Sequence, residues 1–129
     1  IICFALLGVA AIFLGYALRD LLHRTCQIRM QACVRKYDTL LGATIYVQSI
    51  IHVSKHESDT SDVYKNDRID DYNNMILDMV KSEGVYYVDV NEEFDDNGAL
   101  KADAASDGIH LKASYCKEWL DFLKKHTVQ

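Results

Sequence analysis

Asp107 and His110 have residue types and spacing that could do acid–base chemistry. They stand three residues apart in the stretch SDGIHLKASY, with Gly108 and Ile109 between them. An imidazole can take a proton from a hydroxyl nucleophile and return it to a leaving group, provided that an acceptor on its other nitrogen holds the productive tautomer. His110 is therefore the candidate base and Asp107 the candidate acceptor, and Gly108 would allow the tight turn between them.

The elements that must position this pair alternate between helical and strand patterns. Apolar residues recur at helical spacing over residues 10–41 and again over 69–82, where Gly84 follows as a stop signal. TIYVQSIIHV (44–53) and VYYVDV (85–90) are rich in β-branched and aromatic residues and predict buried strands. Residues 54–68 predict a loop, and SYCKEWLDFLKKH (114–126) predicts a last helix.

This order predicts an α/β fold in which the two strands are parallel neighbours, joined through the helix at 69–82. In open sheets of this kind, sites gather at the carboxyl ends of the strands. The loop that contains Asp107 and His110 follows the second strand, so its place in the chain favours a functional role.

Composition excludes some classes of function. The chain has 129 residues, 50% of them hydrophobic, which is enough for one domain with a core. Its formal net charge of −5 gives no support to a nucleic-acid partner. The cysteines form no C-x-x-C pair and predict buried thiols rather than a disulfide or metal framework; they are Cys3, Cys26, Cys33 and Cys116.

The first 18 residues carry no charge and are just long enough to span a bilayer. Residues 1–20 are therefore set apart as an apolar segment, either a membrane anchor or a divergent strand, and residues 21–129 as the α/β part. If the segment spanned a membrane, the arginines after it would place the rest of the chain in the cytoplasm. Localisation otherwise stays open between cytoplasmic and secreted, and the sequence does not indicate an oligomeric state.

The downstream blocks resemble the SGNH, or GDSL-type, hydrolases, a family of esterases and acylhydrolases. The family's last block is D-x-x-H followed by a helix with a tyrosine and often a tryptophan, which Asp107, His110, Tyr115 and Trp119 match. TIYVQSIIHV is similar to a family strand in which proline usually stands where this chain has His52. The run from Asn66 to Asn73 resembles the opening of the next helix, and residues 85–100 resemble the strand and acidic turn before the catalytic loop.

The resemblance implies a three-layer α/β/α sandwich with a parallel, flavodoxin-like sheet, incomplete at the N-terminus. It also implies an ester substrate, such as an O-acetyl or lipid acyl ester, and no cofactor or metal. His110 would be the acid/base and Asp107 the orienting member of a Ser-His-Asp triad. The chain contains neither the family's G-D-S serine block nor its G-x-N-D block, so it is expected to be inactive alone. The alternative is a non-catalytic domain, membrane-associated or not, derived from such a hydrolase.

Other candidate sites are weaker. His52 and His56 have a metal-ligand spacing but lie at the end of a strand, without a helix to hold them. The acidic cluster at residues 92–97 lacks calcium-loop spacing and predicts a solvated turn. Ser49 lacks the turn that surrounds a nucleophilic serine, so it is not expected to replace the missing one.

Overall fold

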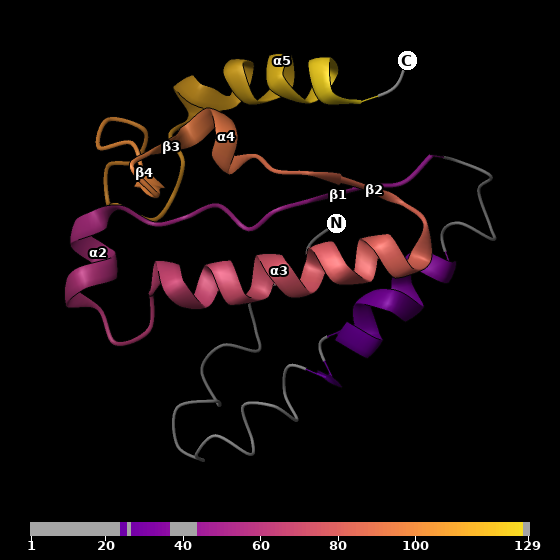
Figure 1. Ribbon diagram of the computed structural model, residues 1–129. Coiled ribbons are helices and arrows are strands. Elements are labelled where there is room, and N and C mark those ends of the chain that lie inside the picture. The colour runs from indigo at the N-terminus through magenta and orange to yellow at the C-terminus, as the bar shows by residue number, and fades with distance from the viewer. Residues whose placement is uncertain (1–23, 26, 37–43, 128–129) are drawn as a thin grey trace.

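The computed structural model describes residues 24–25, 27–36 and 44–127, and shows an α/β fold (Figure 1). The described part of residues 24–36 is helical. The elements that follow are β1 (Tyr46–Gln48), α2 (Lys55–Thr60), α3 (Asn66–Glu83), β2 (Tyr86–Val88), α4 (Asn91–Phe94), β3 (Asp95–Asp96), β4 (Ala99–Leu100), the 3₁₀ turn η2 (Ala113–Tyr115) and α5 (Cys116–His126).

The strands β1 and β2 are parallel neighbours, as the sequence predicts, with Tyr46 opposite Tyr86 and Gln48 opposite Val88. Between them the chain passes through α3, which ends at Gly84 in the left-handed conformation (φ 68°). The described strands also include the hairpin β3–β4, whose turn is Asn97–Gly98. Both turn residues have positive φ, which suits the twist of a two-residue hairpin.

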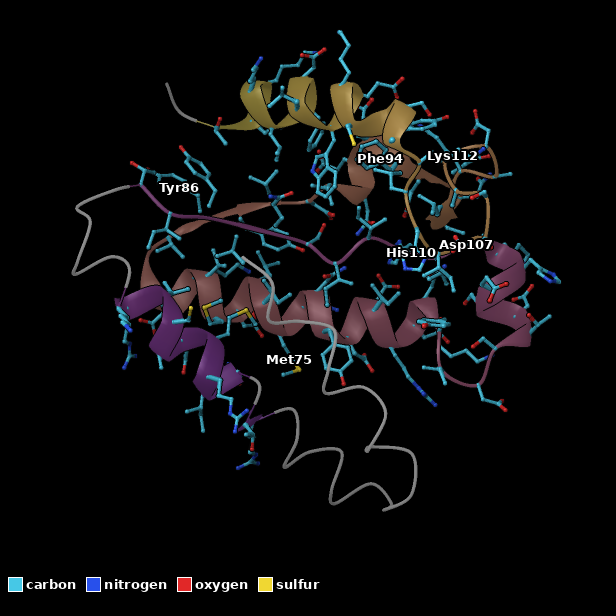
Figure 2. All side chains as sticks on the ribbon, turned by 180° about the vertical axis from the view of Figure 1, so that it is seen from behind. Met75, Tyr86, Phe94, Asp107, His110 and Lys112 are labelled. Atoms are coloured by element: carbon cyan, nitrogen blue, oxygen red, sulfur yellow. The ribbon has the colours of Figure 1, made fainter. Side chains whose placement is uncertain are left out.

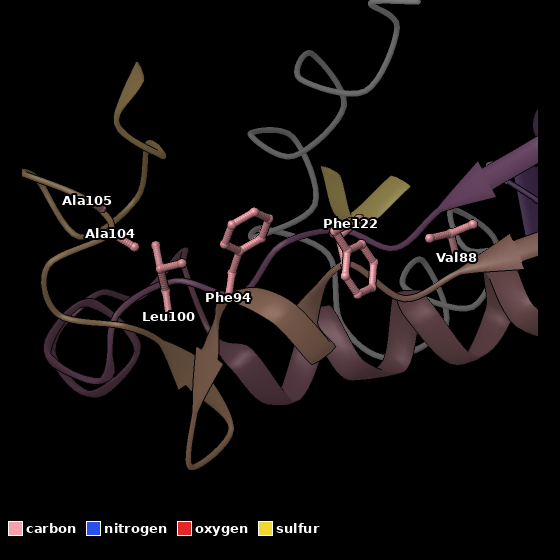
Figure 3. Close-up of a cluster of buried hydrophobic side chains, with 7 residues drawn as sticks. Val88, Phe94, Leu100, Ala104, Ala105 and Phe122 are labelled. Atoms are coloured by element: carbon pink, nitrogen blue, oxygen red, sulfur yellow. The ribbon is translucent and has the colours of Figure 1, made fainter. Parts of the chain in front are cut away.

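Helices lie on both sides of the β1–β2 pair, with α3 on one side and α5 on the other (Figure 1). Side chains alternate along a strand, so each face has its own hydrophobic cluster. On the α3 side, Met79 and Val80 pack with Val47, Tyr87 and the helical residue Val34. On the α5 side the buried cluster is larger and is drawn in Figure 3; it comprises Val88, Val90, Phe94, Leu100, Ala104, Ala105 and Phe122.

The first strand is shorter than the predicted range of 44–53, because side-chain amides take over the backbone hydrogen bonds beyond it. Asn73 accepts from Ile50 N and donates to Ile50 O, at 2.7 and 3.0 Å. Asn66 makes the same pair of bonds with Val53, both at 3.0 Å. Asn91 accepts from His52 N at 3.0 Å and donates to Ile50 O at 2.9 Å. These three asparagines, which are buried and which we call the asparagine brace, supply most of the hydrogen bonds of residues 50–53, where Leu100 of β4 adds one more by donating to Val53 O at 3.1 Å.

We expect Asn91→Ala to lower the free energy of unfolding by about 2 kcal/mol, because it leaves the buried His52 N–H without its acceptor and removes one of the two donors to Ile50 O. Urea denaturation followed by circular dichroism measures the change. Asn74→Ala, at an exposed position of α3, is the control and should stay within about 0.5 kcal/mol of wild type. Equal losses in the two variants would show that the brace does not stabilise the fold.

Three sequence-based expectations need correction. Residues 54–68 are not all loop: α2 forms there, since Ser54 caps it by accepting from Glu57 N at 3.2 Å. The S-x-x-E signature of a capping box marks this start. Residue 66, rather than 69, begins α3. Cys33 and Cys116 are exposed free thiols rather than buried ones. The buried faces of their two helices carry Val34 and Phe122 instead.

The apolar run at residues 1–18 and the proposed boundary at residue 20 lie outside the described residues. Within the described part of the chain, no helix is both long and apolar enough to cross a membrane.

Candidate active site

The loop of residues 106–110 is held at its base and at its tip. At the base, Ala105 and Leu111 form an antiparallel bridge, and Lys112 N donates to Ala104 O at 2.8 Å. At the tip, Ser54 N donates to Gly108 O at 2.7 Å. Because Ser54 follows β1, this bond places the loop beyond the carboxyl end of that strand, where the fold class predicts a site.

Within the loop, Asp107 and His110 contact each other as the sequence predicts (Figure 2). The distance from Asp107 Oδ2 to His110 Nδ1 is 2.6 Å, which is a short, charge-assisted hydrogen bond. The other carboxylate oxygen, Oδ1, accepts from the backbone nitrogens of Ile109 at 3.0 Å and of His110 at 2.8 Å. The carboxylate is thus bonded to the side chain and the backbone of the same histidine.

These donors keep Asp107 ionised. The backbone N–H of His110 contributes most to holding the pKa of the Asp107 carboxyl far below its usual value, followed by the His110 ring and the Ile109 N–H. An ionised carboxylate only accepts hydrogen bonds, so Nδ1 of His110 must carry the proton. In the neutral ring, Nε2 is then the unprotonated nitrogen and can act as a base.

The His110 ring is open to solvent, with 81% of its side chain exposed, against 49% for Asp107. Among the described residues, Nε2 has no hydrogen-bond partner. The structure thus places the ring on the surface. A hollow of about 670 Å³ beside the loop is lined by Asp107 and Gly108 and not by His110.

Tyr115 and Trp119, which complete the matched block, support the loop rather than join the pair. Both rings pack edge-on against the buried Phe94, with centroids 6.2 and 6.3 Å away. The Tyr115 hydroxyl donates to Asp103 Oδ2 at 2.7 Å, and this bond raises the pKa of Tyr115. Trp119 Nε1 donates to Gln48 Oε1 at 2.9 Å and so ties α5 to β1.

A second histidine with carboxylate partners lies at His52, and sequence reasoning missed it. His52 is 6% exposed, and its Nδ1 lies 2.5 Å from Asp95 Oδ2 while its Nε2 lies 2.9 Å from Asp70 Oδ1. The predicted solvated turn at residues 92–97 is therefore wrong for Asp95, whose side chain is only 15% exposed. Its partner is 43 residues away in sequence, so no local spacing could reveal the contact.

The remaining candidates are structural. Ser49 is buried, and its hydroxyl accepts from Val90 N at 2.9 Å, which agrees with the expectation that it is not a nucleophile. His56 is exposed on α2 and does not meet His52 at a shared ligand position. The described residues contain no group of three or more His, Cys, Asp or Glu side chains that could hold a metal ion.

Comparison with solved structures finds a likeness to a Streptococcus pneumonia protein whose name refers to platelet activating factor. The two superpose with a TM-score of 0.70 at 22% sequence identity, over 83% of this chain and 52% of the other. The chain thus corresponds to about half the length of that protein, and the likeness establishes the fold. No protein-family model matches the chain, and no curated protein matches it.

Proposed function

We propose that this chain carries the acid–base arm of a serine ester hydrolase of the SGNH, GDSL-type family, in the C-terminal part of a three-layer α/β/α sandwich. The observation that carries the proposal is the 2.6 Å contact between Asp107 Oδ2 and His110 Nδ1, with Nε2 exposed on the same loop. The position of the loop beyond β1 and the fold shared with a longer protein support it.

In the proposed reaction, His110 Nε2 removes the proton from a serine hydroxyl as the serine oxygen attacks the ester carbonyl. The tetrahedral intermediate then collapses, and the departing alkoxide takes that proton from Nε2 and leaves as the alcohol. In the second half, water loses a proton to Nε2 as it attacks the acyl-serine. The second tetrahedral intermediate then collapses, the serine oxygen takes that proton back from Nε2, and the carboxylic acid is released. Asp107 orients the ring and stabilises the imidazolium in both halves. The serine and the oxyanion donors come from outside the matched segment.

The second candidate is a non-catalytic α/β domain that keeps the fold and the pair. The observation that favours it is that the sequence contains neither a G-D-S nor a G-x-N-D block. The two proposals make opposite predictions for ester turnover by the complete reading frame that contains these residues.

The test is hydrolysis of p-nitrophenyl acetate by the product of that reading frame, with His110→Ala as the variant and His56→Ala as the control. The proposed hydrolase should lose at least about 10³-fold in kcat on His110→Ala, since the base is removed. His56→Ala should leave kcat unchanged, because His56, although it lines the hollow beside the loop, is exposed and makes no hydrogen bond to Asp107 or His110 in the described part of the chain. Turnover that survives His110→Ala, or a folded product without turnover, would overturn the hydrolase proposal.

A spectroscopic prediction can be tested on the 129-residue chain itself. At pH 9, long-range ¹H–¹⁵N correlation spectra should show His110 with a protonated Nδ1 and a bare Nε2, because an ionised Asp107 accepts only at Nδ1. In Asp107→Ala the ring should shift toward the Nε2–H tautomer that free imidazole prefers. A wild-type ring already in the Nε2–H form would contradict its assignment as the base.

A further inference from the structure

We infer that the contact between Ser54 and Gly108 positions the Asp107–His110 pair, so that the segment at the start of α2 is a support of the site. This inference rests on the proposed function, because it assigns positioning residues to the same pair. The two residues belong to segments that are far apart in sequence and meet beyond the carboxyl end of β1.

The approach between the two residues is too close for any side chain at position 108. A Cβ there would lie 2.5 Å from Ser54 Oγ and 2.7 Å from Glu57 Cγ. Gly108 also has φ +74°, a conformation that side chains disfavour. Glycine is therefore required at this position for two reasons: its backbone has a positive φ, and α2 leaves no room for a Cβ atom. The same approach brings Gly108 O to 2.7 Å from Ser54 N.

Gly108 controls the pair because it lies between the carboxylate and its backbone donors. Asp107 Oδ1 accepts from the nitrogens of the two residues that follow Gly108. A rotation about the Gly108 backbone would move these N–H groups and the His110 ring together, relative to the carboxylate. Holding Gly108 O against Ser54 N therefore holds the hydrogen bonds that lower the Asp107 pKa.

Ser54 is itself fixed to the buried part of the molecule. Its hydroxyl caps α2 by accepting from Glu57 N. The N–H and the C=O of the preceding residue, Val53, are both hydrogen-bonded to the Asn66 side chain. The pair is exposed, yet its loop tip is attached through Ser54 to residues that are 4–7% exposed, Val53 and Asn66. This attachment explains how a solvent-exposed pair can keep one geometry.

The first test compares Gly108→Ala with Gly84→Ala, a matched control at φ +68° that has no atom within 4 Å of the added Cβ. The readout in the 129-residue chain is the Asp107 carboxyl ¹³C shift as a function of pH. We expect Gly108→Ala to move the Asp107 titration up toward the ordinary value near 3.9, and Gly84→Ala to leave it where it is in wild type. In an active complete enzyme, Gly108→Ala should lower kcat by about 10²-fold with little change in KM.

A second pair of variants isolates the hydrogen bond and applies even if Gly108→Ala fails to fold. Ser54 has φ −57°, which proline can adopt, so Ser54→Pro removes the N–H donor without straining φ. Ser54→Ala removes the capping hydroxyl but keeps the donor. We expect Ser54→Pro to raise the Asp107 titration midpoint and Ser54→Ala to keep it low.

Folded Ser54→Pro and Gly108→Ala proteins in which Asp107 titrates as in wild type would overturn the positioning role. That result would leave the proposed function intact if His110→Ala still abolished turnover. Conversely, the Asp107 titration could shift in these variants while turnover is unaffected by His110→Ala. That result would keep the positioning role of the Ser54–Gly108 contact and refute the proposed hydrolase function.

Discussion

We expect Asp107→Asn to lower kcat/KM for an ester substrate by about 10⁴-fold in the complete enzyme while the fold stays intact. The asparagine oxygen can still accept from the backbone nitrogens of Ile109 and His110, so the turn is preserved. The new amide group would face His110 Nδ1 as a donor, which favours the tautomer with its proton on Nε2. That nitrogen could then no longer accept the serine proton. Initial rates with p-nitrophenyl acetate and a thermal melt measure the two parts of this prediction.

Asp103→Asn is the matched control for this loss. Asp103 lies in the same connection, and its carboxylate accepts from the Tyr115 hydroxyl, which an asparagine oxygen can also do. We expect turnover within about 3-fold of wild type, since surface substitutions of this kind seldom change more than about 0.5 kcal/mol. Comparable losses in both variants would mean that the loop tolerates no change of charge, and Asp107 would have no special role.

The second large effect is expected at His52. Both ring nitrogens lie within hydrogen-bond distance of carboxylates, which accept but do not donate when ionised, so only the doubly protonated ring can donate to both. Asp95 contributes most to raising the His52 pKa, against the opposing effect of burial, and Asp70 adds to the rise. Replacing the ring by leucine would leave Asp95 as a mostly buried charge without its partner. We expect His52→Leu to cost about 3 kcal/mol in the free energy of unfolding at pH 6.

The pH dependence has a defined sign. The pKa of His52 is higher in the folded chain than its ordinary value of 6.5, so its contribution is complete below 6.5. That contribution is lost as the pH rises through the folded value. Urea unfolding at a series of pH values above 6 should therefore show a decline in wild type that is absent in His52→Leu and retained in His56→Ala.

A double variant separates the charge from the packing. In His52→Leu/Asp95→Leu no buried carboxylate is left without a partner, since Asp70, the other partner of His52, has a side chain that is 59% exposed. Apolar replacement of a buried ion pair is often neutral. We expect this variant to recover most of the loss at pH 6. If the single and double variants are equally unstable, the packing of the His52 ring stabilises the fold, and its charge interaction with Asp95 does not.

The sequence was sufficient for features that depend on local spacing or on the period of apolar residues. The parallel pairing of β1 and β2, the stop of α3 at Gly84 and the contact between Asp107 and His110 follow from such signals. The start of α2 was also readable, because Ser54 and Glu57 have the S-x-x-E spacing of a capping box, but the polar composition of residues 54–68 outweighed that signal.

Long-range polar contacts could not be predicted. The strand expected over residues 44–53 ends at Gln48 because the asparagine brace replaces strand pairing, and an asparagine in a sequence gives no sign of what its amide will meet. The partners of His52 were hidden in the same way, since Asp95 looks like any acidic turn residue. The glycine at position 108 was expected for turn flexibility, while the close approach of Ser54 appears only in three dimensions.

The asparagine brace also has a consequence for the order in which the chain folds. Residues 50–53 obtain backbone hydrogen bonds from side chains that lie 13, 23 and 41 residues further along. Closing loops of this size costs entropy before any bond is gained, so these bonds are expected to form after local helical turns. In pulse-labelling hydrogen exchange during refolding, the amides of Ile50, His52 and Val53 should therefore gain protection later than those within α3. The segment that leads from β1 to Ser54 would then be among the last to order, and the loop that it supports could reach its final geometry only after that step.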